Sequence, residues 1–337
     1  MMRNPLLLAA DMGGTKTDLA IYSRAGGPRA PLARSTVHSA DYPSLQALLA
    51  AFIATVKRPI DRACIAVCGP VVNGRSRITN LPWELDEKSL AQELHISSVH
   101  LLNDLEATAA AVPLLSDSEL RTLNAGWPEP NGAVGVLAPG TGLGEAFLTR
   151  DGSQYVTHCS EGGHADFAPT DEEQIGLLRY CLERSDHVSV EHVCSGIGIP
   201  RIHAYLRDAG HSADTPAVAQ AIAAAPDPSV VIIANGVDPH SRSPLCAATM
   251  EMFASILASE AANLALKVFA TGGIYMAGGI PVHALSALQA PRFLESFTRK
   301  GRFRQAMARL PVHVVTTHAA LLGAAAHGLG TIPGASS

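Results

Sequence analysis

A short turn near the start of the chain carries residue types that bind phosphate. Residues 11–17 read Asp-Met-Gly-Gly-Thr-Lys-Thr and lie between two apolar runs, residues 6–10 and 19–22. Two adjacent glycines allow successive backbone N–H groups to line a concave anion site, and the hydroxyls and the lysine add donors. No helical pattern follows, so the turn is neither a GxxxxGK[ST] nor a GxGxxG loop. The alternative is an ordinary hairpin turn with an incidental Asp11.

A second turn of the same kind lies in the middle of the chain. Residues 139–144 read Pro-Gly-Thr-Gly-Leu-Gly and again separate two apolar runs, residues 134–138 and 146–148. Its recurrence makes a chance match less credible for either turn.

A strand end presents the best candidate for a general base. The apolar residues 99–102 run directly into Asn103 and Asp104, and an alanine-rich helical segment follows. In an open α/β sheet, ligands bind just beyond the carboxyl ends of the strands. Asp104 has this position, although an aspartate there can instead cap the following helix.

A glycine loop at residues 160–167 groups acids with an imidazole. It reads Ser-Glu-Gly-Gly-His-Ala-Asp-Phe, and such side chains suit sugar hydroxyls because carboxylates accept hydrogen bonds and imidazole can donate or accept. The alternative is a surface turn with a solvated His164. Further on, Ser189 is predicted to cap a short helix that contains Glu191, where a glutamate in the first turn is favoured by the helix dipole alone.

Cysteine chemistry offers a different interpretation of the same region. Cys159, His164, Cys181 and Cys194 are possible zinc ligands by type, but their spacing is irregular. The chain has six cysteines without a CxxC pair and no secretory signal, so we expect reduced thiols.

Alternating strand and helix patterns predict the elements that position these residues. Helices are expected over residues 45–56 after Ser44, after Asp86, after a Thr170 cap, over a long segment through residues 252–268, and over 319–329. Strands are expected at residues 63–67, 154–156, 274–277 and 312–315, with an Asn73-Gly74 hairpin turn. A Pro/Gly-rich stretch at residues 113–131 predicts a boundary between two lobes.

Composition limits the class of function. The 337 residues are 47% hydrophobic and 16% charged with a formal net charge of −5, so the chain has no basic footprint for nucleic acid. The first apolar run ends after five residues and no run of eighteen apolar residues occurs, which predicts a cytoplasmic protein without a membrane segment.

The order and separation of these motifs resemble the bacterial glucokinase family over nearly the whole chain. The matching strings are Leu102-Asn103-Asp104, Gly140-Thr141-Gly142-Leu143-Gly144, Glu161-Gly162-Gly163-His164-Ala165-Asp166-Phe167-Ala168-Pro169 and Ala277-Gly278-Gly279-Ile280. The resemblance implies an α/β, two-lobed actin-like ATPase (ribonuclease H-like) fold, with mixed sheets flanked by helices and an active-site cleft between the lobes. We expect a small lobe at residues 1–114, completed by a helix at 319–334, and a large lobe at 115–318.

The chain also departs from related patterns. It lacks the cysteine-rich zinc motif after His164 and the helix-turn-helix of ROK kinases and repressors. Lys16 stands where glucokinases usually have asparagine, and Cys159-Ser160 replaces a Pro-Gly pair. These departures leave the phosphate affinity and the identity of the sugar open.

The resemblance implies a role for each motif. Asp104 would be the general base for transfer of the ATP γ-phosphoryl group to the 6-hydroxyl of D-glucose, and Asp11 would orient Mg²⁺ through water. The other sugar hydroxyls would be held by Asn80, Asn103, Glu161, His164 and Glu191. ATP would be held by Ala10, Asp11, Met12, Gly13, Gly14, Thr15, Gly140, Thr141 and Gly142, with Gly278 and Gly279 against the adenosine.

Three further expectations accompany these roles. The resemblance implies a homodimer, and neither nucleic acid nor membrane is an expected partner. Alternative functions are a kinase for another hexose or an amino sugar, and a non-catalytic actin-like sensor of sugar or nucleotide. ADP and polyphosphate remain alternative phosphate donors at this point.

Overall fold

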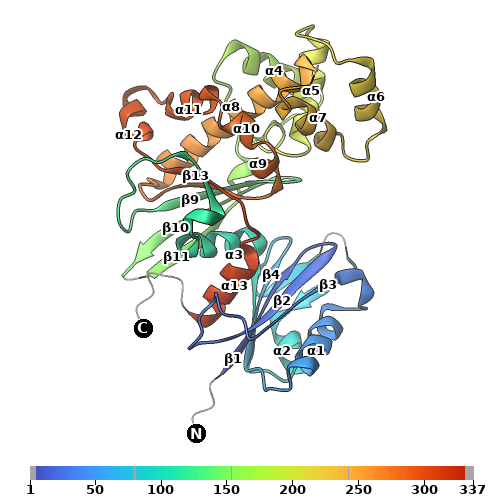
Figure 1. The fold of residues 1–337 in the computed structure, drawn as a ribbon, viewed down its shortest axis with the longest axis vertical. Helices are drawn as coiled ribbons and strands as arrows, with labels where there is room; N and C mark the ends of the chain where they lie inside the picture. Colours follow the sequence, from blue (N-terminus) through green and yellow to red (C-terminus); the bar gives the residue numbers. More distant parts are fainter. Residues whose placement is uncertain (1–4, 79–80, 153, 242, 331–337) are drawn as a thin grey trace. The chain divides into compact units, whose positions relative to one another are not determined.

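Contacts between residues divide the chain into two units, each with its own sheet and core. The structure is a computed structural model that describes residues 5–78, 81–152, 154–241 and 243–330. Unit 1 comprises residues 1–116, 148–158 and 317–337, and unit 2 comprises residues 117–147 and 159–316. Figure 1 shows the elements of both units along the chain.

Unit 1 is built on a five-stranded sheet in the order β3-β2-β1-β4-β7. Strands β1, β4 and β7 are parallel, whereas β2 and β3 run antiparallel to their neighbours. The strands and helices of this unit are β1 (Leu6–Met12), β2 (Lys16–Ser23), β3 (Ala33–His38), α1 (Leu45–Val56), β4 (Arg62–Val67), β5 (Arg75–Arg77), β6 (Glu84–Asp86), α2 (Glu87–Glu93), β7 (Ser98–Asn103), α3 (Asp104–Ala111) and α13 (Ala320–Leu329).

Alternate side chains of β1 enter different cores on the two faces of this sheet. Leu8 and Met12 pack in a cluster with the apolar residues of α1, whereas Leu7 and Ala9 pack with α13. Because successive strand residues point to opposite faces, one buried strand serves both cores. The unbroken apolar run at residues 6–10 is therefore the signature of a strand covered on both sides.

Unit 2 contains most of a six-stranded mixed sheet in the order β11-β10-β9-β12-β13-β8. Its elements are β8 (Leu120–Asn124), β9 (Val134–Pro139), β10 (Leu143–Asp151), β11 (Gln154–Ser160), α4 (Glu172–Leu182), α5 (Gly198–Asp208), α6 (Pro216–Ala224), α7 (Pro228–Val237), α8 (Pro244–Val268), β12 (Gly273–Met276), α9 (Gly279–His283), α10 (Leu285–Leu288), α11 (Pro291–Thr298), α12 (Arg304–Ala308) and β13 (Val312–Val315). The far ends of β10 and β11, within residues 148–158, group with unit 1, whereas the sequence pattern placed them in the large lobe.

Helix α8 is the core helix of unit 2. It packs against α5, α7 and α11, and most of its 25 residues are buried. By length and composition it is apolar enough to cross a membrane, but 83% of its most apolar window is buried inside the structure. This degree of burial is typical of a helix in a protein core.

The structure confirms most of the predicted elements. The glycine hairpin, the Ser44 cap of α1, the Asp86 cap of α2, the long helix α8 and the Asn73-Gly74 turn are all present. In that turn both residues have positive φ, at 51° and 72°, as a two-residue hairpin requires.

Two local predictions are wrong. Helix α4 is capped by Asp171, whose carboxylate accepts from the Gln174 N–H at 2.9 Å, and not by Thr170. Ser189 begins no helix, because its N–H and hydroxyl both bond to the His192 ring and the segment forms turns. At the start of α4 the N–H and hydroxyl of Thr170 both donate to Gln174 Oε1, so that threonine is already engaged and the next residue provides the cap.

Helices α3 and α13 of unit 1 approach closely at Gly323. A Cβ atom at this position would lie 1.6 Å from the carbonyl oxygen of Ala107, which belongs to the α3 backbone. The C-terminal helix therefore depends on a missing side chain for its contact with the helix that begins at Asp104.

We predict that Gly323→Ala destabilises the protein, because backbone cannot yield as a flexible side chain does. Alanine gains about 1 kcal/mol in helix propensity, but overpacking costs about 1–3 kcal/mol and is greatest against backbone. Thermal and urea unfolding measure the change, with Leu322→Ala on the half-buried face of α13 as the control. A Gly323→Ala variant more stable than the wild type would contradict the close approach.

Candidate active site

Two carboxylates of unit 1 lie at the edge of the sheet where its parallel strands end. The register aligns Met12 with Val67 and Val67 with Asn103, so Asp11 and Asp104 occupy the carboxyl ends of β1 and of the β7–α3 junction. Asp11 also pairs with Asp18 across the β1–β2 hairpin. Three acidic side chains are therefore concentrated at one edge.

This arrangement raises the pKa of both main carboxyls. Burial, followed by the charges of Asp104 and Asp18, raises the pKa of Asp11 to about 6, and His318 opposes the shift. Burial also raises the pKa of Asp104, opposed by its hydrogen bonds to the Leu105 and Asp104 N–H groups and to Asn103. A group with a raised pKa is a better proton acceptor, so Asp104 has the electrostatic character of a general base.

Asn103, not Asp104, caps helix α3. Its side-chain oxygen accepts from the N–H groups of Leu105 at 2.9 Å and Glu106 at 3.4 Å, and its amide nitrogen donates to the Gly69 carbonyl at 3.0 Å. The interpretation of Asp104 as the N-cap is therefore wrong. Asp104 is the first residue of the helix, and its position is set by the cap before it.

Hydrogen bonds from Ser39 hold the glycine turn of unit 1 in place. The Gly13 N–H donates to the Lys16 carbonyl at 2.9 Å, and the Ser39 hydroxyl donates to the Gly13 carbonyl at 3.2 Å. The Ser39 N–H donates to the Thr15 carbonyl at 3.0 Å. With these carbonyls held, Thr15 and Lys16 stay exposed at the tip. The side chains of Ala10 and Met12 are buried in the core, so only their backbone can face a ligand.

The glycine turn of unit 2 is closed over a glutamate. The Gly140 N–H donates to the Gly142 carbonyl at 2.8 Å, and the Leu143 N–H donates to Glu191 Oε2 at 2.9 Å. A Cβ at Gly142 would lie only 2.3 Å from the same oxygen. The second glycine of the turn is therefore required by the carboxylate that packs against it.

The acidic loop joins the Glu191 segment through a short ladder of backbone hydrogen bonds. The N–H groups of Glu191 and Val190 donate to the carbonyls of Gly163 and Ala165, both at 2.9 Å. This pairing brings the His164 ring within 3.9 Å of Glu191 Oε1 and 3.7 Å of Glu161 Oε2. The His164 and Glu161 side chains are mostly exposed, at 61% and 84%, so both are available to a ligand.

The later glycine pair lies beside the turn of unit 2. The Ala277 N–H donates to the Leu137 carbonyl at 2.8 Å, and Gly278 has φ of 91° with its Cβ position 3.1 Å from the Pro139 carbonyl. Residues 140–142 and Gly278–Gly279 are thus adjacent within unit 2. The candidate phosphate and adenosine contacts of this unit are brought together.

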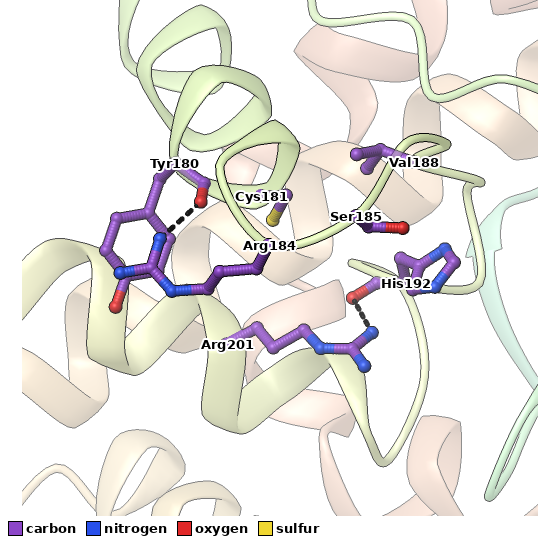
Figure 2. A pocket seen from close by; sticks show the side chains of 7 residues that line it. All are labelled: Tyr180, Cys181, Arg184, Ser185, Val188, His192 and Arg201. Atoms are coloured by element: carbon purple, nitrogen blue, oxygen red, sulfur yellow. Dashed lines mark hydrogen bonds between the residues drawn. The ribbon is translucent and has the colours of Figure 1, made fainter.

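A cavity of about 300 Å³ is lined by residues of α4, of the segment 184–192 and of α5, among them Arg184, His192 and Arg201 (Figure 2). Its two arginines are engaged with the backbone, because Arg201 donates to the His192 carbonyl at 3.1 Å and Arg184 to the Tyr180 carbonyl at 2.6 Å. Burial, followed by the Arg201 charge, lowers the pKa of His192. The cavity wall therefore supports the segment that carries Glu191.

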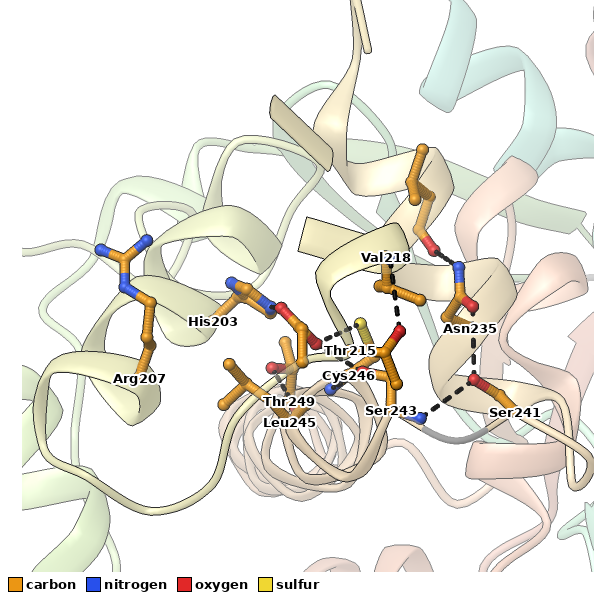
Figure 3. Close-up of polar contacts among 12 residues, drawn as sticks. His203, Arg207, Thr215, Val218, Asn235, Ser241, Ser243, Leu245, Cys246 and Thr249 are labelled. Atoms are coloured by element: carbon orange, nitrogen blue, oxygen red, sulfur yellow. Dashed lines mark hydrogen bonds and ion pairs between the residues drawn. The ribbon is translucent and has the colours of Figure 1, made fainter. Parts of the chain in front are cut away.

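The predicted alternative of a zinc site is not supported. Among the described residues, the potential ligand atoms that lie close together belong to His203, Asp214 and Cys246, and not to Cys159, His164, Cys181 and Cys194. Asp214 accepts from Ser243 and lies 2.8 Å from His203 Nε2 and 3.5 Å from Cys246 Sγ. Figure 3 shows the His203, Ser243 and Cys246 side chains of this group. Burial raises the pKa of Cys246 to about 11, so it stays a thiol, and the group forms a hydrogen-bonded network at the start of α8.

Asn80 lies outside the described residues. Sequence reasoning missed two buried glutamates, Glu145, which is 2% exposed and packs against Gly162, and Glu260, which is 4% exposed. A glutamate at an inward position of the 143–148 strand was the signal that could have identified the first of them.

We predict that Asn103→Ala lowers the free energy of unfolding by about 1–2 kcal/mol, the usual cost of losing an N-cap. Urea unfolding measures the loss, and Asn124→Ala, at the end of β8, tests whether any asparagine truncation gives the same value. Asn103→Ser retains a capping oxygen without adding a charge beside Asp104 and should recover most of the stability. Equal stability of wild type and Asn103→Ala would mean that the cap does not hold α3.

Comparisons with known proteins give a consistent result. The family described as Glucokinase matches residues 8–330. The Glucokinase of Nostoc punctiforme is 38% identical over 335 residues, covering 95% of this chain and 98% of the relative. The crystal structure of a glucokinase from an Antarctic psychrotroph matches with a TM-score of 0.83 and 32% identity, covering 96% of this chain and 98% of that one.

A more distant structure shares the fold alone. A ROK family glucokinase from Streptomyces griseus, in complex with glucose and AMPPNP, matches with a TM-score of 0.60 and 18% identity. The match covers 96% of this chain and 99% of that one.

Proposed function

The chain belongs to the glucokinase family, and from this premise we propose that it transfers the γ-phosphoryl group of ATP to the 6-hydroxyl of D-glucose, with Asp104 as the general base. It is a sugar kinase, a phosphotransferase with an alcohol acceptor, and it has the mixed α/β fold of the actin-like sugar kinases. The observation that carries the proposed role of Asp104 is that Asn103 performs the capping. This leaves the carboxylate of Asp104 at the strand end with a raised pKa.

Asp104 would accept the proton of the sugar hydroxyl as the phosphoryl group leaves the nucleotide. Phosphoryl transfer needs little covalent assistance, so positioning and charge stabilisation supply most of the catalysis. A positioned base typically contributes about 10²–10⁴-fold in rate. The backbone of α3 keeps the carboxylate in place, since Asp104 Oδ1 accepts from the Leu105 N–H at 2.9 Å.

Asp11 fits the requirements of a magnesium site. Its carboxylate is partly buried beside two further acids, and oxygen ligands in a region of excess negative charge suit a hard divalent cation. We assign Asp11 to Mg²⁺, through water. When bound, this ion neutralises charge on the nucleotide phosphates. Residues 10–15 and 140–142 would then hold the phosphates through backbone N–H groups, with Gly278 and Gly279 beside the adenosine.

The sugar would be recognised mainly by unit 2. Glu161, His164 and Glu191 already form one connected group, and their exposed oxygen and nitrogen atoms match sugar hydroxyls. Asn103 and Asn80 complete the proposed set. A sugar that lacks one matched hydroxyl leaves a polar group of the protein unpaired, and this penalty is the proposed origin of specificity.

A panel of hexoses tests the function directly. The full chain with ATP and Mg²⁺ is offered glucose, mannose, fructose and N-acetylglucosamine, and ADP release is measured. Glucose should give the highest kcat/KM. A higher value for another sugar would support the alternative of a kinase for another hexose or an amino sugar. Sugar binding without any ADP release would support the non-catalytic sensor.

Measuring the phosphorylated sugar with different donors identifies the phosphate donor. Replacing ATP by ADP or polyphosphate should abolish product formation. The homodimer and the cytoplasmic location that the sequence predicts also remain parts of this proposal. Light scattering of the purified protein tests the first of them.

We predict that Asp104→Ala keeps the fold and glucose binding but lowers kcat by about 10²–10⁴-fold, because the proton acceptor is lost. Stability should not fall, since the change removes a carboxylate that is unfavourably buried. Calorimetry with glucose and the coupled ADP assay measure the two properties. Asp61→Ala, an exposed aspartate before β4 at the opposite edge of the same sheet, is the matched control. A kcat for Asp104→Ala within about tenfold of the wild type would refute the base assignment.

A further inference from the structure

Two glutamates are buried in unit 2, Glu145 on β10 and Glu260 on α8, with 2% and 4% exposure. Among the described residues the Oε1 atom of each makes no hydrogen bond, although Lys267 Nζ lies 3.6 Å from Oε1 of Glu260. Two ionised carboxylates in a buried site repel each other and both lose hydration, so such a pair normally retains one proton. None of the roles assigned above uses these residues.

The surrounding charges indicate which glutamate carries the proton. Glu260 has Lys267 Nζ at 3.6 Å from Oε1 and accepts from Asn263 at 2.9 Å on Oε2. Lys300 donates to Asn263 at 2.5 Å and to Ser259 at 3.3 Å. These partners stabilise Glu260 as the anion. Glu145 therefore holds the proton of the pair.

The pKa directions agree with this assignment. Burial, followed by the Glu260 charge, raises the pKa of Glu145 to about 7, with Lys267 opposing and a hydrogen bond to Glu260 reinforcing the shift. Burial, followed by Glu260 and Glu145, raises the pKa of the neighbouring Cys194 thiol, so that group stays neutral. Burial lowers the pKa of Lys300, and Glu260 opposes this shift.

Glu145 lies directly against the glycine loop of the proposed sugar site. A Cβ at Gly162 would lie 2.0 Å from Glu145 Oε2 and 3.1 Å from Ser160 Oγ, so the carboxyl group occupies the space of a side chain at that position. The Gly162 N–H donates to Ser160 Oγ at 3.0 Å. The next residue, Gly163, is held by the Glu191 N–H and packed against the Leu143 carbonyl. The loop that carries Glu161 and His164 is thus in contact with Glu145 at Gly162.

We propose that Glu145 is a positioning residue for the sugar, which in its protonated form, paired with Glu260, holds the Gly162 turn so that Glu161 and His164 face the substrate. When Glu145 releases its proton to water, two like charges are enclosed behind the turn. The turn then moves to relieve the repulsion, and sugar affinity falls. This inference rests on the proposed function, because it assigns the loop to sugar binding.

Glucose affinity as a function of pH tests the inference. Calorimetry without nucleotide, between pH 5.5 and 8.5, excludes effects on ATP binding. The wild-type Kd should rise roughly tenfold with a midpoint near pH 7, which corresponds to about one pKa unit between the free and sugar-bound forms. Glu145→Gln, which keeps the shape and cannot ionise, should retain the low-pH Kd throughout. Glu295→Gln, the same change on the exposed face of α11, should follow the wild type.

A second variant gives an independent arm if Glu145→Gln does not fold. In Glu260→Gln the neighbouring charge is removed and Lys267 becomes available, so Glu145 should ionise at lower pH and the midpoint should shift below that of the wild type. A wild-type Kd that stays constant between pH 6 and 8 would overturn the proposal. So would a Glu145→Gln variant with the wild-type pH dependence.

Thermal unfolding separates this inference from the proposed function. Because the folded-state pKa of Glu145 is raised above its ordinary value of 4.5, the folded protein retains a proton that the unfolded chain releases. Its contribution to stability is therefore lost as pH rises from about 4.5 to 7 and is constant above that range. The Tm of Glu145→Gln relative to wild type should increase across this interval.

If wild type binds no glucose and phosphorylates no hexose, the proposed function fails, while this Tm difference still decides the protonation of Glu145.

Discussion

The arrangement of unit 1 depends on keeping two mutually repelling carboxylates at one edge of a sheet. Asp11 and Asp104 are held there because β1, β4 and β7 are parallel and end in register. Strands β1 and β4 are buried on both faces, so apolar packing supplies the free energy that holds the acids in an environment that raises their pKa. A carboxylate with a raised pKa is both a better base and a better ligand for a cation, and the two acids divide these roles in the proposed mechanism.

In unit 2, glycines leave space for buried or partly buried carboxyl groups. Glu191 packs where a side chain at Gly142 would lie, and Glu145 packs where one at Gly162 would lie. The glycines of the two motifs therefore do more than permit a turn, since each makes room for a carboxyl group of another segment. This explains why the turn, the acidic loop and the Glu191 segment form one connected structure within the unit, although Leu143 and Glu191 are 48 residues apart in sequence.

The sequence was most informative where a local rule decides the structure. Paired glycines between apolar runs predicted both hairpins, and Asn-Asp after a strand predicted the acid at the sheet edge. The rules were less informative where nearby polar groups compete. Asn103 is the N-cap of α3, a role that Asp104 could have filled, and the Ser189 N–H donates to the His192 ring in a segment without a helix. Residues 201–244 gave a weak pattern because α6 has no buried residue and α7 has only three, so neither shows a strong apolar stripe. The Glu145–Glu260 pair joins a strand to a helix distant in sequence, and no periodicity reveals such a contact.

The central claim is that the carboxylate of Asp104 meets the hydroxyl that receives the phosphoryl group. A crystal structure of the protein with glucose and a non-hydrolysable ATP analogue tests it most directly. The account predicts an Asp104 oxygen within hydrogen-bonding distance of the glucose 6-hydroxyl, about 2.6–3.2 Å, with that hydroxyl facing the terminal phosphate. A bound glucose whose 6-hydroxyl contacts a different acid, with Asp104 directed elsewhere, would contradict it.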